Sequence, residues 1–210
     1  MAEDGQSIGA IPGALIEVLK NANNDRLPIV VMMCGISVPS INHAHDTFPS
    51  TIGSGKTTLS TSLQSHLPAY NFQRLSIDCI VYERHGIYSV DFPAELGEKY
   101  QEEADEIFHA STVQQLEQIP PSNLILDRAF YAKKDRDEYR RLVEDRGAKT
   151  ILVYLQADRD TLWRRIQERK ARIGGRVAGA AFEVTEDILS SYLDGFQCPR
   201  GEGEFVINIS

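Results

Sequence analysis

Short, largely apolar segments recur along the chain and are separated by longer amphipathic ones. The short segments span residues 27–34, 72–77, 123–127, 150–155 and 205–209. Residues 29–34 form a continuous apolar run, which is typical of a central strand buried on both faces of a parallel sheet. The pattern therefore predicts five strands, with 29–34 inside the sheet.

The intervening segments carry apolar residues at helical spacing. This periodicity predicts helices over 12–20, 56–67, 94–119, 133–146, 159–172 and 185–195, and Thr185 has the side chain of a helix N-cap. Residues 79–93 contain Gly86 and Pro93 and are expected to be irregular. Strands that alternate with helices predict an α/β domain of three layers, with helices on both faces of a parallel sheet.

Composition narrows the class of protein. The chain has 210 residues, 42% of them hydrophobic and 25% charged, as expected for one soluble domain. Its net charge of −8 argues against a broad surface for nucleic acid or anionic membrane. No apolar run approaches the roughly 18 residues that span a bilayer, and no signal-peptide pattern is present. We therefore expect a soluble cytoplasmic protein, monomeric or homodimeric.

The three cysteines, Cys34, Cys79 and Cys198, are odd in number and widely spaced. They form neither a disulfide framework nor a C-x-x-C metal site. Cys34 and Cys79 lie in apolar strand surroundings, so we expect buried, reduced thiols there.

A polar, glycine-containing stretch precedes the predicted helix 56–67. Glycines let backbone N–H groups converge on a polyphosphate, and the positive end of the helix faces the same anion. A lysine at position 56 can reach the β and γ phosphates, and the hydroxyl of Thr57 can bind Mg²⁺. The stretch thus predicts binding of ATP and Mg²⁺ by Gly53, Ser54, Gly55, Lys56, Thr57 and Thr58.

The motif lacks its first glycine, because Ser50 occupies that position. Gly35-Ile36-Ser37, at the end of the first strand, would complete a P-loop if residues 38–52 were removed, so Gly35 is also a predicted nucleotide contact. We interpret 38–52, which is polar and without periodicity, as an insertion that splits the motif. It is a retained non-coding segment, a gene-model error or a genuine surface loop. The predicted division is an N-terminal extension with a short helix at 1–27 and a P-loop domain at 28–210.

Two acids follow predicted strands, where ligands of parallel sheets gather. Asp127 is a candidate Mg²⁺ ligand beside Thr57, or else a structural acid paired with Arg128. Asp78 is a candidate base that accepts the proton of a substrate hydroxyl, or else a cap of the next element.

Arginines gather on the predicted helix 159–172. Arg165, Arg169 and Arg172 share one face, and Gly174-Gly175 follows as a possible hinge. The face is either a solvated surface paired with acids such as Glu168, or a lid that neutralises a transferring phosphoryl group.

We choose Arg169 and Arg172 as the lid residues. Arg128 lies close enough to its strand end to contact a substrate anion. We expect Arg136, Arg140 and Arg141 on the surface. The chain has no Asn-Lys-x-Asp sequence of the kind that selects guanine, which favours ATP.

These motifs together resemble small P-loop kinases of the AAA_33 type, near the zeta-toxin, chloramphenicol-phosphotransferase and gluconate-kinase-like groups. The resemblance covers roughly residues 28–209 and rests on the split P-loop, Asp78, Leu126-Asp127-Arg128 and residues 162–169. It implies an ATP-dependent phosphotransferase whose five parallel strands have the order 2-3-1-4-5. Substrates differ among such proteins, so the resemblance implies no particular acceptor.

The expected activity is Mg²⁺-dependent transfer of the γ-phosphoryl group of ATP to a hydroxyl of a small molecule. Lys56, Asp78, Arg169 and Arg172 are the expected catalytic residues. Two alternatives stay open: a nucleotide-binding or ATP-hydrolysing regulatory protein, and a variant whose phosphate loop is disrupted by 38–52.

Overall fold

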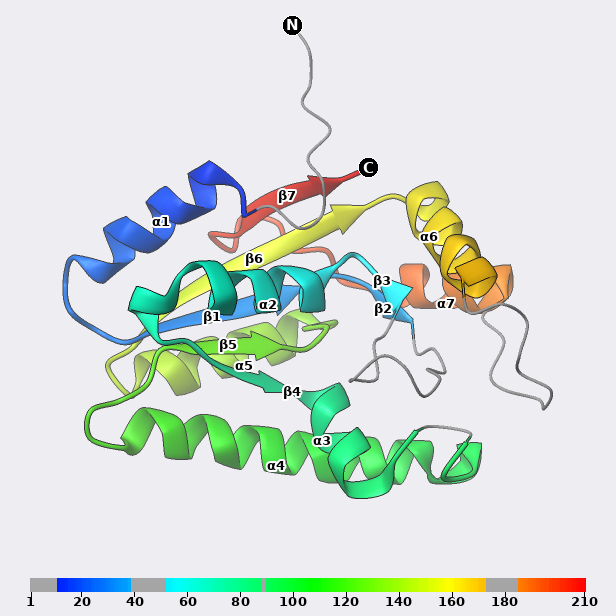
Figure 1. Ribbon diagram of the computed structural model, residues 1–210, viewed down its shortest axis with the longest axis horizontal. Helices are drawn as coiled ribbons and strands as arrows, with labels where there is room; N and C mark the ends of the chain where they lie inside the picture. Colours follow the sequence, from blue (N-terminus) through cyan, green and yellow to red (C-terminus); the bar gives the residue numbers. More distant parts are fainter. Residues whose placement is uncertain (1–10, 39–51, 88–89, 173–184) are drawn as a thin grey trace, which may run out of the picture.

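Five parallel strands form the central sheet, in the order β4-β5-β1-β6-β7 (Figure 1). The computed structural model describes residues 11–38, 52–87, 90–172 and 185–210. The strands of the sheet are β1 Ile29–Cys34, β4 Gln73–Ser76, β5 Leu124–Asp127, β6 Lys149–Ala157 and β7 Phe205–Ile209. Numbered along the chain within this sheet, their order is 2-3-1-4-5, which confirms the predicted fold class.

Helices lie on both faces of the sheet and give three layers (Figure 1). The α-helices are α1 Gly13–Asn23, α2 Lys56–His66, α3 Ile77–His85, α4 Gly97–Glu117, α5 Lys133–Glu144, α6 Arg159–Arg172 and α7 Glu186–Gly195. Short 3-10 turns cover Pro68–Tyr70 and Ala94–Leu96. The α1 and α2 helices pack on one face, and α3 to α7 supply the buried residues on the other.

The β1 strand is buried along its whole length, as its continuous apolar run predicts. Ile29, Val31 and Met33 belong to the core shared with α1 and α2. The alternate residues Val30, Met32 and Cys34 belong to the larger core on the opposite face. This two-sided burial, with β5 and β6 as neighbours, makes β1 the central strand of the sheet.

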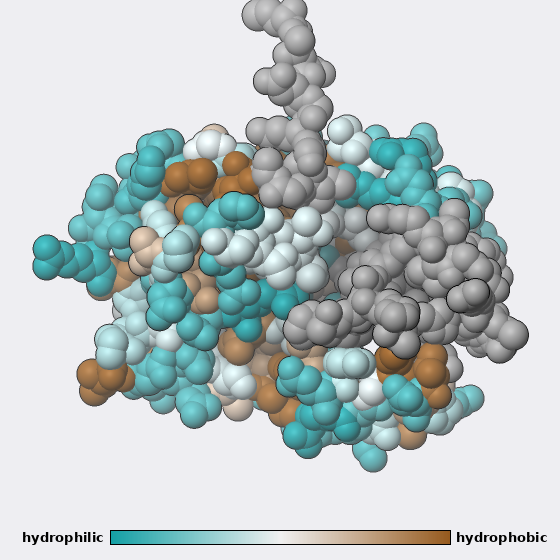
Figure 2. All heavy atoms as spheres, in the orientation of Figure 1, coloured by the Kyte–Doolittle hydropathy of each residue, from teal (hydrophilic) through white to brown (hydrophobic). Residues whose placement is uncertain are grey.

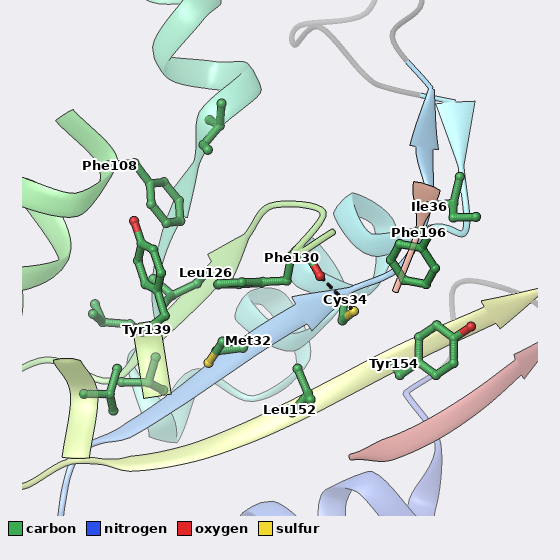
Figure 3. Packing of buried hydrophobic residues seen from close by; sticks show 14 of the residues in the cluster. Met32, Cys34, Ile36, Phe108, Leu126, Phe130, Tyr139, Leu152, Tyr154 and Phe196 are labelled. Carbon is green, nitrogen blue, oxygen red and sulfur yellow. Dashed lines mark hydrogen bonds between the residues drawn. The ribbon is translucent and has the colours of Figure 1, made fainter. Parts of the chain in front are cut away.

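Aromatic side chains fill the larger core around β1 (Figure 3). The Cys34 thiol donates a hydrogen bond to the Phe130 carbonyl at 3.5 Å, drawn as the dashed line in Figure 3. Burial raises the pKa of this thiol to about 12. Cys34 is thus a buried thiol as predicted, whereas Cys79 is only partly buried and Cys198 is exposed.

One local prediction is wrong: residues 79–93 are not irregular throughout. The chain turns from β4 directly into α3, so the strand ends at Ser76 and the helix reaches His85. Ser76 is the N-cap, and its hydroxyl accepts a hydrogen bond from the Cys79 N–H at 3.5 Å. A serine cap and an acid in the first turn stabilise a helix start, and Gly86, at φ 83°, ends the helix.

Most of the face seen in Figure 2 is hydrophilic outside the grey atoms. Across the described residues, we find no helix that combines the length and the apolar character needed to cross a membrane.

Candidate functional site

The two halves of the split motif lie side by side in the structure. After Gly35 the chain forms a short antiparallel hairpin of β2, Ser37–Val38, and β3, Ile52–Gly53, which lies beyond the end of β1 (Figure 1). Ser37 is the direct register partner of Gly53. The Ser54 N–H donates to the Ile36 carbonyl at 3.1 Å. Residues 39–51 lie outside the described residues, but both ends of the predicted insertion meet at this hairpin.

Gly35 occupies a position that only glycine fits. Its φ is +152°, and an added Cβ would collide with Ser54 Oγ and lie 3.0 Å from the Leu155 carbonyl oxygen. Its N–H donates to the Ala129 carbonyl at 3.2 Å, which connects the end of β1 to the segment after β5. Gly35 is therefore part of the loop that the sequence predicts, although 38–52 separates it from the rest of the motif.

Lys56 is the first residue of α2 and its side chain lies inside the loop. Gly55, the residue before it, has φ 95° in the left-handed region, which glycine adopts without strain. The Lys56 side chain is 5% exposed, and its Nζ donates to the Gly35 carbonyl at 2.9 Å. Burial lowers the pKa of Lys56, and the negative charges of Asp127 and Asp78 oppose this lowering. Both predicted acids therefore act electrostatically on the same ammonium group.

A buried hydroxyl in the loop has no hydrogen-bond partner among the described residues. Ser54 is 1% exposed, and its Oγ lies next to Gly35 without accepting or donating a hydrogen bond. A buried polar atom without a partner costs about 1–3 kcal/mol, so it is a feature that a ligand can relieve. The loop, the ammonium and this hydroxyl together fit an anionic ligand such as a phosphate group.

Asp127 is paired with Arg74, which the sequence analysis does not single out. Arg74 lies in β4, the neighbour of β5, and donates from Nε at 3.0 Å and from Nη2 at 2.6 Å to the same oxygen, Oδ2. Burial alone would lower the pKa of Arg74, but the charge of Asp127 and the hydrogen bond to it raise this pKa above its usual value.

Arg128, the structural partner considered for Asp127, is engaged elsewhere. It forms an ion pair with Asp105 of α4 at 3.0 Å. Its guanidinium carbon lies 5.2–5.7 Å from the ring centroids of Phe108, Phe130 and Tyr139. Arg128 thus connects the end of β5 to α4 and an aromatic cluster.

Asp78 lies in the first turn of α3, two residues beyond the end of β4. The N-cap of α3 is Ser76, so Asp78 does not have the capping role that the sequence leaves open. Its carboxylate is half-buried, and its charge acts on Lys56.

The α6 helix packs beside β3, so the arginine-bearing helix neighbours the loop (Figure 1). Arg164 pairs with Glu168 at 3.2 Å, and Arg165 donates to the Ser210 carbonyl at 3.1 Å. The backbones of Arg169 and Arg172 belong to α6, but their side chains are outside the described part of the chain. The proposed hinge, Gly174-Gly175, is outside it as well.

A protein-family comparison matches residues 50–181 to the AAA_18 family, described as an AAA domain. The match covers more than half of the chain and includes Gly53 to Thr58, Asp78 and Asp127. The chain belongs to this AAA domain family.

Solved structures share the fold of this AAA domain at low sequence identity. A candidate kinase from Chloroflexus aurantiacus is 19% identical, with a TM-score of 0.58 over 87% of this chain and 85% of that chain. A protein named APE1195 is 20% identical, with a TM-score of 0.51 over 88% and 86%. A structure of the PezAT chromosomal toxin–antitoxin system of Streptococcus pneumoniae is 13% identical, with a TM-score of 0.51 over 90% and 73%. No curated protein matches the chain. The AAA domain therefore has a P-loop kinase-like fold.

Arg136 of the AAA domain is buried, so the prediction of a surface position is wrong. Its side chain has no exposed surface and binds both carboxylate oxygens of Glu202, at 2.7 and 2.8 Å. It shares the inner face of α5 with Tyr139 and Val143. The i, i+3, i+7 spacing of these three residues could have revealed its position.

Arg74 could be found only through the strand order, because its partner Asp127 lies on the adjacent strand and is distant in sequence. No group of three or more His, Cys, Asp or Glu side chains in the described ranges is arranged to hold a metal.

Proposed function

We propose that this AAA domain is a Mg²⁺-dependent phosphotransferase that moves the γ-phosphoryl group of ATP to a hydroxyl of a small molecule. The observation that carries the proposal is the buried Lys56 ammonium, held by the Gly35 carbonyl inside a loop closed across the hairpin. A buried cation beside an unpartnered hydroxyl and the N-terminus of a helix is an arrangement that favours a polyphosphate.

The proposed nucleotide contacts are the loop residues Gly35, Gly53, Ser54, Gly55, Lys56, Thr57 and Thr58. The Thr57 hydroxyl, in the first turn of α2, and the Asp127 carboxylate are the proposed magnesium ligands, Asp127 directly or through water. Magnesium, when bound, would neutralise charge on the β and γ phosphates.

Asp78 is the proposed base. It would accept the proton of the acceptor hydroxyl while the hydroxyl oxygen bonds to the γ-phosphorus and the bond to the β-phosphate oxygen breaks, releasing ADP. Its half-buried position near Lys56 supports this role. Arg169 and Arg172 are proposed to neutralise the transferring group, because α6 packs beside β3.

The proposal extends to the narrower AAA_33 and zeta-toxin-like grouping, to ATP rather than GTP, and to a cytoplasmic monomer or homodimer. The disrupted-loop alternative is less favoured, since Ser37 pairs with Gly53 while 38–52 is present. The regulatory alternative requires the loop but neither Asp78 nor the arginines.

The test is a screen of small hydroxyl compounds with γ-labelled ATP, together with thermal unfolding in Mg-ATP. A site at 100 times its dissociation constant stabilises by about 2.7 kcal/mol. We expect Lys56→Ala to abolish both the stabilisation and the transfer. Asp78→Asn should keep the stabilisation and lose transfer. If millimolar Mg-ATP does not raise the unfolding temperature of the wild-type protein, the proposal is contradicted. Hydrolysis without any acceptor, unchanged in Asp78→Asn, would instead support the regulatory protein.

A further inference from the structure

The two oxygens of the Asp127 carboxylate are not equivalent. Oδ2 accepts both hydrogen bonds from Arg74, at 2.6 and 3.0 Å. Both hydrogen bonds from Arg74 therefore end on one oxygen, and Arg74 donates none to Oδ1. Side-chain exposure is 3% for Asp127 and 11% for Arg74, so the pair is largely shielded from water.

Arg74 also contacts the helix that carries Asp78. Its Nη1 donates to Cys79 Sγ at 3.7 Å, in the first turn of α3. Ser76, which caps that helix, is the register partner of Asp127 across the sheet. One guanidinium therefore contacts both the acid at the end of β5 and the first turn beyond the end of β4.

We propose that Arg74 is a positioning residue of the magnesium–nucleotide site, which occupies Oδ2 of Asp127 and reserves Oδ1 for the metal or a water bound to it. The inference rests on the proposed function. A guanidinium can do this because its planar fork donates two hydrogen bonds, from Nε and Nη2, to the single oxygen Oδ2, whereas an ammonium is a single point of charge. Partners that orient metal ligands typically change metal affinity or activity 10–100-fold when they are replaced.

The competing explanation is that Arg74 only stabilises the fold. The chain offers a matched comparison in Arg136, which binds Glu202 with the same two nitrogens at 2.7 and 2.8 Å and is equally shielded. That pair involves α5 and the segment before β7. Its loss should reduce stability without changing the magnesium dependence.

The experiment uses the full chain and measures the magnesium concentration that gives half of the maximal thermal shift induced by Mg-ATP. We expect Arg74→Lys to raise this concentration about 10–100-fold. Arg136→Lys should leave it unchanged, whatever its own unfolding temperature. In an Asp127→Asn background, Arg74→Lys should have no further effect, because Arg74 acts through that carboxylate.

Equal magnesium requirements in wild type and Arg74→Lys would overturn the inference. So would an Arg74→Lys effect that persists in Asp127→Asn. A second measurement uses only wild-type protein, so it does not depend on whether a variant folds. The Arg74 Nε–H should stay protected from hydrogen exchange after Mg-ATP is added. Loss of that protection means that the metal displaces Arg74, which also overturns the inference.

Failure of the proposed role of Arg74 can be distinguished from failure of the proposed phosphotransferase function. If Mg-ATP binds wild type and Arg74→Lys equally at every magnesium concentration, only the role of Arg74 is wrong. If Mg-ATP does not bind the wild type at all, the proposed function is wrong and the role of Arg74 falls with it.

Discussion

At the scale of single residues, the site depends on how closely Gly35 and Ser54 approach each other. The Gly35 backbone leaves no space for a Cβ, and the neighbouring Ser54 hydroxyl is buried without a partner in the described part of the chain. The loop is therefore close-packed on the Gly35 side. The unsatisfied Ser54 hydroxyl lowers the stability of the unligated protein.

Gly35→Ala should abolish the Mg-ATP-induced thermal shift, because the new methyl group would displace Ser54 and the Gly35 carbonyl that holds Lys56. Ser54→Ala is the comparison variant, because it removes the hydroxyl without adding a group at Gly35. It should raise the free energy of unfolding of the unligated protein by about 1 kcal/mol and weaken ATP binding roughly tenfold. Unfolding curves and nucleotide titrations measure both effects. Normal ATP binding by Gly35→Ala would show that the loop can relax.

At the scale of elements, a buried ion pair joins α5 to the segment before β7. Arg136 binds Glu202 through two nitrogens and also donates to the Phe130 carbonyl at 2.9 Å. Its hydrogen bonds lower the pKa of Glu202 below the ordinary value of 4.5. The ionised pair therefore contributes stability above pH 4.5, which is lost as the pH falls through the pKa of the folded protein.

Arg136→Ala should lower the free energy of unfolding by about 3–5 kcal/mol, because it leaves Glu202 buried without its partner. Glu202→Gln should also destabilise the protein at pH 7, and its difference from wild type should shrink below pH 4.5. Urea unfolding at pH 7 and pH 3.5 measures this. Lys20→Ala, which removes an exposed pair with Glu17, is the control and should change little. A constant difference between Glu202→Gln and wild type at both pH values would contradict the assignment.

The hairpin of β2 and β3 predicts that the segment 38–52 can be removed. Register partners in antiparallel strands lie about 4.5–5.5 Å apart at Cα, and a peptide bond spans 3.8 Å, so joining Ser37 to Gly53 requires only a small shift.

We expect the chain lacking 38–52 to fold and to bind Mg-ATP at least as tightly as the full chain. A shorter loop has a smaller entropic cost of closure. Thermal unfolding with and without Mg-ATP measures this, and Lys56→Ala in the same deletion should abolish the shift. A deletion that unfolds or no longer binds would show that the segment is an integral part of the loop.

At the scale of the whole molecule, the N-terminal helix belongs to the same core as the sheet. Leu15 and Leu19 of α1 have no exposed surface and pack with Val31 and Met33 of β1. Lys149, the first residue of β6, donates to the Ala22 carbonyl at 3.0 Å. The predicted boundary between residues 27 and 28 therefore separates segments that share one core.

Leu19→Ala should lower the free energy of unfolding by about 2–5 kcal/mol, the usual effect of a cavity in a core. Deletion of 1–27 should destabilise the protein further, whereas deletion of 1–10 keeps both leucines and serves as the control. Thermal unfolding of the three variants measures this. Equal stability after deletion of 1–27 would support an independent extension.

Local pattern was sufficient for most of the elements. The apolar run at 29–34 predicts β1, and the periodicity around Thr185 predicts the start of α7. Burial of this strand and capping of this helix depend on residues that are neighbours in the sequence. The prediction for 79–93 is wrong because Ser76 caps α3 and Gly86 lies at the end of that helix. The sequence also predicts that Gly35 and Gly53 belong to one loop, and the hairpin places them together.

The sequence by itself determined the alternating elements and the parallel sheet, since each of these depends on spacing within one segment. The nucleotide contacts of the loop stay a prediction. Only the tertiary structure decided the partners of Asp127, Arg128 and Arg136. Those partners lie on other strands and helices, and which charge meets which depends on strand order and on the burial of both groups.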